Sequence, residues 1–159
     1  MTKWSLTQTF IARVHPSMHD GVSPRYRLTI FSRRIEHMSR FDRVEIPYGA
    51  YWSTPFAKWQ GVLQHLHSVR FAAHVAKSEL AKRNLTPDLF DFGVLGITQV
   101  QYQSFYGASW PLYEIGMKHV VGPQLSQVCS TGPRVLLTGA AEVQLGLATT
   151  ALLLGADRT

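Results

Sequence analysis

The residues best suited to chemistry surround the single cysteine of this 159-residue chain. Cys129 stands in the run Val128-Cys129-Ser130-Thr131-Gly132, and Pro133 follows at the start of a long apolar segment. Proline is tolerated in the first turn of a helix, so the run predicts a tight turn that opens a helix. Free backbone N–H groups and the helix dipole at such a turn stabilise a thiolate. Cys129 is therefore a candidate nucleophile for thioesters; the alternative is a small buried apolar cysteine.

The neighbours of Cys129 fit the nucleophilic interpretation. Ser130 and Gly132 are small enough to let a substrate approach, and backbone amides in this turn can hold an oxyanion. His119 precedes Cys129 by ten residues and is a second, weaker candidate, as a base for the thiol.

The seven histidines raise the question of a metal site. His67 and His74 can share a helix face, but no carboxylate or cysteine at ligand spacing completes a set, so we expect no metal. Gly93-x-x-Gly96 is not a dinucleotide fingerprint, and no phosphate-binding Gly-Lys-Ser/Thr loop is present. We therefore expect no bound cofactor.

The elements that must position Cys129 alternate between strand and helix patterns after residue 43. Apolar residues at three- and four-residue spacing predict a helix over 68–83 with Ser68 as its N-cap, and Pro87 can start a further helical turn. Alternating or continuous apolar runs predict strands near residues 43–46, 92–100, 124–128 and 149–156.

The segment 135–147 is apolar nearly all round the helical wheel, which is typical of a buried helix. With the strands on either side it predicts a crossover unit in an α/β fold. The rival interpretation is a membrane span over 135–156, but Glu142 would lie within it at a cost of roughly 2.5–3.5 kcal/mol. We therefore expect no membrane association.

Aromatic side chains are concentrated between residues 102 and 113, among Gln, Ser and Gly. This composition is typical of a binding loop. Packing at a subunit contact explains it equally well.

The net charge of +6 is concentrated in residues 1–43, which carry eight Lys or Arg and three acidic residues. We divide the chain into a basic extension, 1–43, and a domain, 44–159. The extension has three interpretations: sequence upstream of a true start at Met38, a mitochondrial-type presequence, or an arm for an acidic partner such as a nucleic acid. The first is our preferred one, and we expect no nucleic-acid partner. A lone cysteine and the lack of a signal-peptide pattern predict a cytoplasmic protein, or a mitochondrial-type one if the presequence is real.

The order of elements over 44–158 resembles the amino-terminal half of the thiolase superfamily. The resemblance rests on a Thr54-Pro55-Phe56 turn with Gly61 beyond it, the strand at Gly93–Gly96, the turn at Cys129 and the helix after it. A Ser104-Phe105-Tyr106-Gly107 loop and the final residues 156–159 are most similar to acetyl-CoA acetyltransferase-like members.

The resemblance implies a layered α-β-α half-fold with a mixed sheet and a buried helix after the nucleophile turn. It implies that Cys129 takes an acyl group from an acyl-CoA, with Ser104, Phe105, Tyr106, Gly107 and Gly132 binding substrate. Thiolases take an activating histidine and a second cysteine from their carboxy-terminal half, so this chain would need that half from elsewhere, in a homodimer or from a partner chain. The alternative is a non-catalytic thiolase-like subunit, or a truncated fragment, with a structural or regulatory role.

Overall fold

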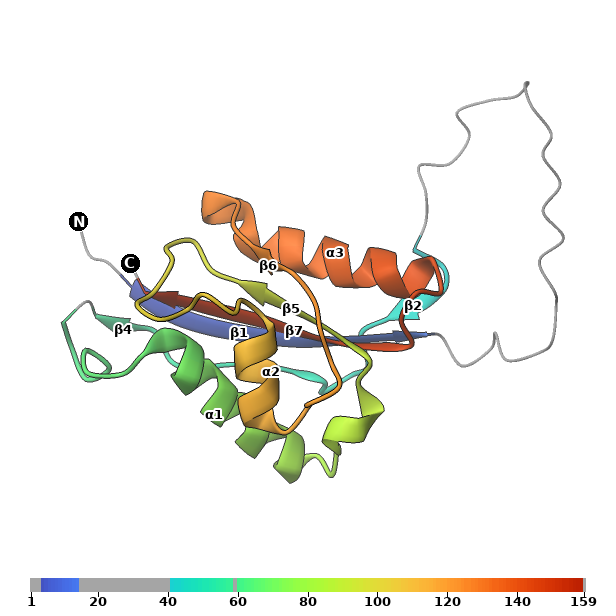
Figure 1. Ribbon diagram of the computed structural model, residues 1–159, viewed down its shortest axis with the longest axis horizontal. Helices are drawn as coiled ribbons and strands as arrows, with labels where there is room; N and C mark the ends of the chain where they lie inside the picture. Colours follow the sequence, from blue (N-terminus) through green and yellow to red (C-terminus); the bar gives the residue numbers. More distant parts are fainter. Residues whose placement is uncertain (1–3, 15–40, 59, 159) are drawn as a thin grey trace, which may run out of the picture.

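The described residues form one mixed sheet with helices on both faces (Figure 1). The computed structural model describes residues 4–14, 41–58 and 60–158. The strands are β1 (Trp4–Val14), β2 (Val44–Glu45), β3 (Tyr51–Ser53), β4 (Ala57–Lys58), β5 (Phe92–Gly96), β6 (Gln124–Leu125) and β7 (Thr150–Arg158). The helices are α1 (Ser68–Lys82), α2 (Ser109–Ile115) and α3 (Thr131–Gln144), with short 3₁₀ turns at Pro87–Leu89 and Val128–Ser130.

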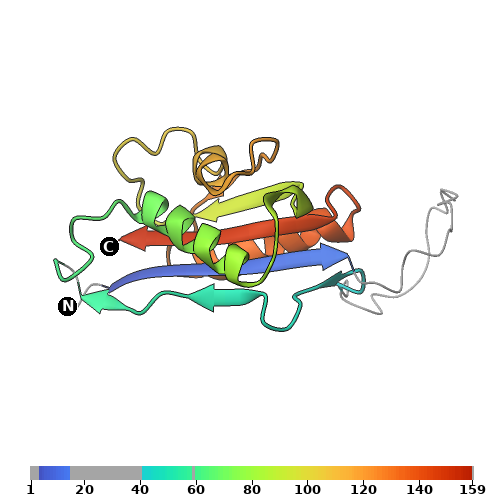
Figure 2. The same cartoon turned by 90° about the horizontal axis from the view of Figure 1, so that it is seen from below.

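The strand order along the sheet is β2-β1-β7-β5-β6, with β3 and β4 also paired to β1. β5 is parallel to both β6 and β7, whereas β1 is antiparallel to β7. Figure 2 shows β7 between β1 and β5. The parallel strands place their carboxyl ends at one edge of the sheet, from which the loop to α2 and the turn to α3 depart (Figure 1).

The two sides of β7 pack against different helices, α1 and α2 on one side and α3 on the other. Leu152, Leu154 and Ala156 belong to the core cluster that includes residues of α1 and α2, and Ala151 and Leu153 belong to the cluster beneath α3. All five are buried. Residues alternate between the two faces of a strand, so the continuous apolar run in β7 is explained by a sheet covered on both sides. The expected strand near 149–156 and the layered α-β-α architecture are confirmed.

The placement of β1 differs from the sequence interpretation, in which residues 1–43 lay outside the domain. β1 pairs with β7 from Ser5 opposite Arg158 to Arg13 opposite Thr150. Its buried side chains include the short Thr9 and Ala12, so the segment lacks a strong apolar signature. The folded domain therefore begins well before residue 43. Residues 1–3 and 15–40, including Met38, lie outside the described residues, so the start site and the presequence remain predictions.

The predicted helix over 68–83 is confirmed as α1, which buries Val69, Ala72, Ala73, Ala76 and Leu80 on one stripe. The cap differs: His67 is the N-cap, and Ser68 is the first helical residue, buried with an unpaired hydroxyl. The helical turn starting at Pro87 is confirmed, but β5 and β6 are shorter than expected because the chain turns away after Gly96 and Leu125.

α3 is buried along one stripe only, at Thr131, Val135, Gly139 and Val143. Leu137 on its outer side is 45% exposed, and Leu145 just beyond its end is 70% exposed. The expectation of a helix enclosed on all sides is thus not met within the described part of the chain, where the sheet covers one side of α3.

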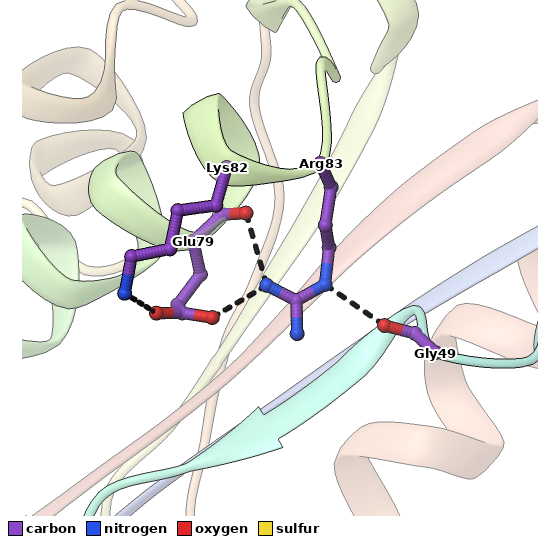
Figure 3. A network of polar contacts seen from close by, with 4 residues as sticks. All are labelled: Gly49, Glu79, Lys82 and Arg83. Atoms are coloured by element: carbon purple, nitrogen blue, oxygen red, sulfur yellow. Dashed lines mark hydrogen bonds and ion pairs between the residues drawn. The ribbon is translucent and has the colours of Figure 1, made fainter.

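A polar network joins the end of α1 to the loop between β2 and β3 (Figure 3). Arg83 donates from Nε to the carbonyl oxygen of Gly49 at 2.8 Å and from Nη1 to the Glu79 carboxylate at 2.5 Å. Its guanidinium carbon also lies 4.9 Å from the Trp52 ring centroid. Hydrogen bonds from Lys82 and Arg83 hold the pKa of Glu79 below its ordinary value. Arg83 therefore fastens the chain after β2 to α1.

We expect Arg83→Ala to lower the free energy of unfolding by about 1–2 kcal/mol, because it removes charge-assisted hydrogen bonds and a cation–π contact. Arg83→Lys should lower the free energy of unfolding almost as much, since an ammonium group cannot reproduce the planar hydrogen-bond donors of the guanidinium. Urea denaturation followed by circular dichroism measures both. Lys82→Ala is the control and should cost under about 0.5 kcal/mol, as its ion pair is exposed. If Arg83→Lys were as stable as the wild type, this account would be contradicted.

Asp91, just before the first residue of β5, secures the start of β7. Its carboxylate accepts from Thr149 Oγ1 at 2.6 Å, from the Thr149 amide at 2.8 Å and from the Thr150 amide at 3.0 Å. Burial raises the pKa of Asp91, but these hydrogen bonds lower it by more, so the pKa lies below its ordinary value.

We expect Asp91→Asn to destabilise the fold by about 0.5–1.5 kcal/mol at neutral pH, since the amide accepts fewer of these hydrogen bonds. The folded pKa is depressed, so the stabilisation is present above the unfolded pKa of about 3.9 and is lost as pH falls through the folded pKa. Urea titrations between about pH 7 and pH 3 should show the wild type and the variant converging below about pH 4. A constant difference across that range would contradict this.

Candidate functional site

Cys129 lies in the 3₁₀ turn Val128–Ser130, between β6 and the first residue of α3. Its thiol is exposed. The turn leaves the sheet at the carboxyl edge of β5 and β6, where ligands of open α/β sheets commonly bind. The sequence had predicted this arrangement of strand, turn and helix, and the structure has it.

Local hydrogen bonds hold the turn in a strained form. Thr131 Oγ1 accepts from the Gln127 amide at 2.8 Å and donates to the Val128 carbonyl at 2.7 Å. The Ser130 amide donates to the Gln127 carbonyl at 2.9 Å. Val128 has a φ of 49°, in the left-handed region that a β-branched residue rarely adopts. Such strain persists only where surrounding contacts impose it, and it clusters at functional sites. Sequence reasoning did not identify Thr131, although a Thr beside a turn is a known signal.

The start of α3 lies close against β5. A methyl group built on Gly96 would lie 2.6 Å from Val135 Cγ2 and 3.0 Å from Thr131 Cγ2. The missing side chain at Gly96 thus brings the helix, and the turn before it, near the sheet.

A second group of polar side chains lies at the same edge. Thr98, just after β5, donates its hydroxyl to the Asp157 carboxylate of β7, and its amide donates to the other carboxylate oxygen at 3.3 Å. Ser126 donates to the Thr98 carbonyl at 3.3 Å. These contacts link the carboxyl ends of β5 and β7 to the segment between β6 and Cys129. The sequence did not predict these contacts, because Thr98, Ser126 and Asp157 are far apart in the chain and only the order of the strands brings them together.

The predicted substrate loop lies at the same end of the molecule as the start of α3 (Figure 1). Phe105 and Tyr106 are 91% and 72% exposed. Ser104 is buried, and its hydroxyl donates to the Gln101 carbonyl at 2.7 Å, so this side chain closes the loop. Gly107 has a φ of 56° and packs on Gln124 of β6. Gly132 lies in the first turn of α3, where backbone amides lack helical partners.

His119 is far from Cys129. Its Nε2 lies 3.0 Å from the carbonyl oxygen of Phe90, at the beginning of β5. Cys129 lies toward the other end of β5, because it follows Leu125 of β6, whose carbonyl oxygen accepts from the Ile97 amide at 3.0 Å. Five strand residues span about 16 Å, so His119 is not placed to act as a base for this thiol.

Solved structures with a similar fold are thiolases. Human mitochondrial 3-ketoacyl-CoA thiolase aligns at 21% identity over 60% of this chain with a TM-score of 0.56, and its complex with CoA at 19% identity with a TM-score of 0.54. The Bacillus anthracis acetyl-CoA acetyltransferase aligns at 21% identity over 61% of this chain, with a TM-score of 0.56. The alignments cover 25% of each of those chains. No protein-family model and no curated protein sequence matches this chain.

The described chain therefore has a partial thiolase-like fold, as the sequence resemblance implied. The structural likeness shows the fold alone, and it spans about a quarter of the length of each of those chains. Among the described helices, none is long and apolar enough to cross a membrane, and α3 and β7 occupy the segment considered for a span.

Proposed function

We propose that this chain is part of a thiolase-like acyltransferase in which Cys129 receives an acyl group from a coenzyme A thioester. One observation supports this most strongly. On a thiolase-like fold, the only sulfhydryl of the chain is exposed in a strained turn at the beginning of α3, beside the carboxyl ends of parallel strands.

The reaction at this site has two bond changes. The Cys129 thiolate attacks the thioester carbonyl, and in our proposal the Gly132 amide in the first turn of α3 stabilises the resulting oxyanion. The intermediate collapses with cleavage of the bond between the carbonyl carbon and the coenzyme sulfur. Coenzyme A leaves as a thiolate and takes a proton, and Cys129 keeps the acyl group until a second nucleophile removes it. Phe105 and Tyr106 offer exposed aromatic surface for the acyl-CoA near this turn.

A complete catalytic cycle needs protein beyond this chain. Among the described residues, Leu137 on the outer side of α3 and Leu145 just beyond its end are exposed, and a groove of about 460 Å³ lies between α3 and the segment around β2. Leu136, Leu137, Phe41 and Ile46 line the groove. A second thiolase-like half, from a copy or a partner chain, covers this surface in our proposal and brings the base that His119 cannot supply.

Incubation with acetyl-CoA and intact-mass spectrometry test the proposal. We expect one acetyl group on the protein, mapped by peptide digestion to Cys129, with one coenzyme A released. Cys129→Ala is the matched control and should remain unmodified. A synthetic peptide of residues 124–134 should react much more slowly, since it lacks the folded turn.

If the protein thiol reacts no faster than the peptide, the acyl-enzyme proposal fails. That result would favour the alternative, a non-catalytic thiolase-like subunit, for which the exposure of Leu137 on α3, within the described part of the chain, is the supporting observation.

A further inference from the structure

A basic hollow lies on the side of the sheet opposite α3, along the exposed face of α1. Its volume is about 870 Å³. His65, His67, Arg70, His74, Lys77 and Glu114 supply its polar lining, with Phe71 as an apolar wall. We call this site the α1 hollow; neither the acyl-transfer site nor the thiolase comparison explains it.

The basic side chains follow one stripe of the helix. His67, Arg70, His74 and Lys77 are spaced by three or four residues, so they lie on one face, away from the stripe that packs on the sheet. At 1.5 Å per residue the stripe is about 15 Å long. The lining therefore offers donors over the length of more than one phosphate group.

Glu114, the one acidic side chain among the described residues that line the hollow, is already engaged. Glu114 accepts from Trp110 Nε1 at 3.0 Å and lies 3.4 Å from Arg70 Nε. Arg70 is 67% exposed, and its guanidinium carries five donors, so it can bind another anion beside Glu114. Two permanent cations, Arg70 and Lys77, therefore face one paired carboxylate.

His67 carries an unpaired ring nitrogen. Its Nε2 lies 2.6 Å from the carbonyl oxygen of Tyr102, which requires a proton on Nε2. Its Nδ1 is buried without a hydrogen-bond partner. With the proton on Nε2, Nδ1 of the neutral ring is an acceptor, so this atom offers no donor to an anion. The ring is held edge-on to Trp110, with centroids 5.0 Å apart.

These features favour a small anion over two other ligands. The described residues hold no group of three or more His, Cys, Asp or Glu side chains arranged for a metal ion. Residues 44–159 are almost neutral overall, which is unlike the broad basic surface of a nucleic-acid-binding domain. Guanidinium and ammonium groups bind phosphate through short charge-assisted hydrogen bonds, and Phe71 can contact an attached apolar or aromatic group.

We propose that the α1 hollow binds a small organic phosphate, with Arg70 and Lys77 holding the phosphate groups. This inference is independent of acyl transfer at Cys129. Titration of the ¹⁵N-labelled protein with inorganic diphosphate, and separately with ADP, tests it by amide chemical shifts. We expect saturable shifts within residues 65–77 and around Trp110, with affinity falling as salt is raised.

The double variant Arg70→Ala/Lys77→Ala should weaken binding of both probes by about tenfold or more. Arg43→Ala/Lys58→Ala removes two exposed cations outside the hollow and should bind as the wild type does. Tighter binding of ADP than of diphosphate identifies a nucleotide-like ligand, and equal binding identifies the phosphate group alone. Absence of saturable shifts, or equal loss in both double variants, overturns the proposal.

Discussion

Gly122→Ala is expected to remove roughly 3 kcal/mol or more of the free energy of unfolding. A methyl group on Gly122 would lie 1.7 Å from the carbonyl oxygen of Gly93 and 2.8 Å from its carbonyl carbon. Both are backbone atoms of β5, so no side-chain rotation relieves the overlap. The segment around Gly122 must therefore move away from β5. Two hydrogen bonds hold it there: the Gly93 amide donates to the Val121 carbonyl at 3.2 Å, and the Leu95 amide donates to the Pro123 carbonyl at 3.1 Å.

Equilibrium urea denaturation, followed by far-ultraviolet circular dichroism, measures this effect. Val121→Ala is the neighbouring control; its side chain is 66% exposed, so the change should be within about 0.5 kcal/mol. The loss at Gly122 matters for function because the segment continues through β6 to Cys129. An alanine variant as stable as the wild type would show that β5 and β6 are not held this closely.

Gly96→Ala should both destabilise the protein and disturb the nucleophile turn. The added methyl group would meet Val135 Cγ2 and Thr131 Cγ2 in the first turns of α3. Overpacking of this kind costs about 1–3 kcal/mol, and here it pushes the beginning of α3 away from β5. Thr131 also holds the turn through Val128 and Gln127. We therefore expect a lower free energy of unfolding together with slower acetylation of Cys129.

A double-mutant cycle with Val135→Ala identifies the cause. Removing the γ-methyl groups of Val135 makes room for the new methyl group, so the two changes together should cost less than the sum of the single changes. Urea denaturation gives the coupling, and the acetylation rate of the double variant should partly recover. Strictly additive costs would mean that the contact between Gly96 and Val135 does not position the helix.

The nucleophile turn was predictable because its signals are local. A cysteine among small residues, followed by Pro133 and an apolar helix, specifies a turn at a helix start without knowledge of the rest of the fold. The stripe of α1 and the helical turn at Pro87 were predictable for the same reason. The burial of α3 was overestimated, because an apolar wheel indicates surfaces that need covering but does not show that this chain covers them.

The role of β1 could not be predicted from its own residues. Its position between β7 and the strands β2, β3 and β4 comes from pairing with residues near the other end of the chain. Thr9 and Ala12 are buried because neighbouring elements enclose them. Because residues 1–43 are rich in Lys and Arg, the sequence suggested a basic extension there and did not predict the strand β1.

The amino-acid sequence by itself determined the alternating α/β pattern, the two main helices and the placement of Cys129 at the opening of one of them. These features depend on periodicity and on residues adjacent in the chain. Only the tertiary structure decided that β1 joins the sheet, that His119 lies far from Cys129, and that imidazole and cationic groups of α1 line a hollow with Glu114. Those relations join residues distant in sequence, and strand order and helix packing set them.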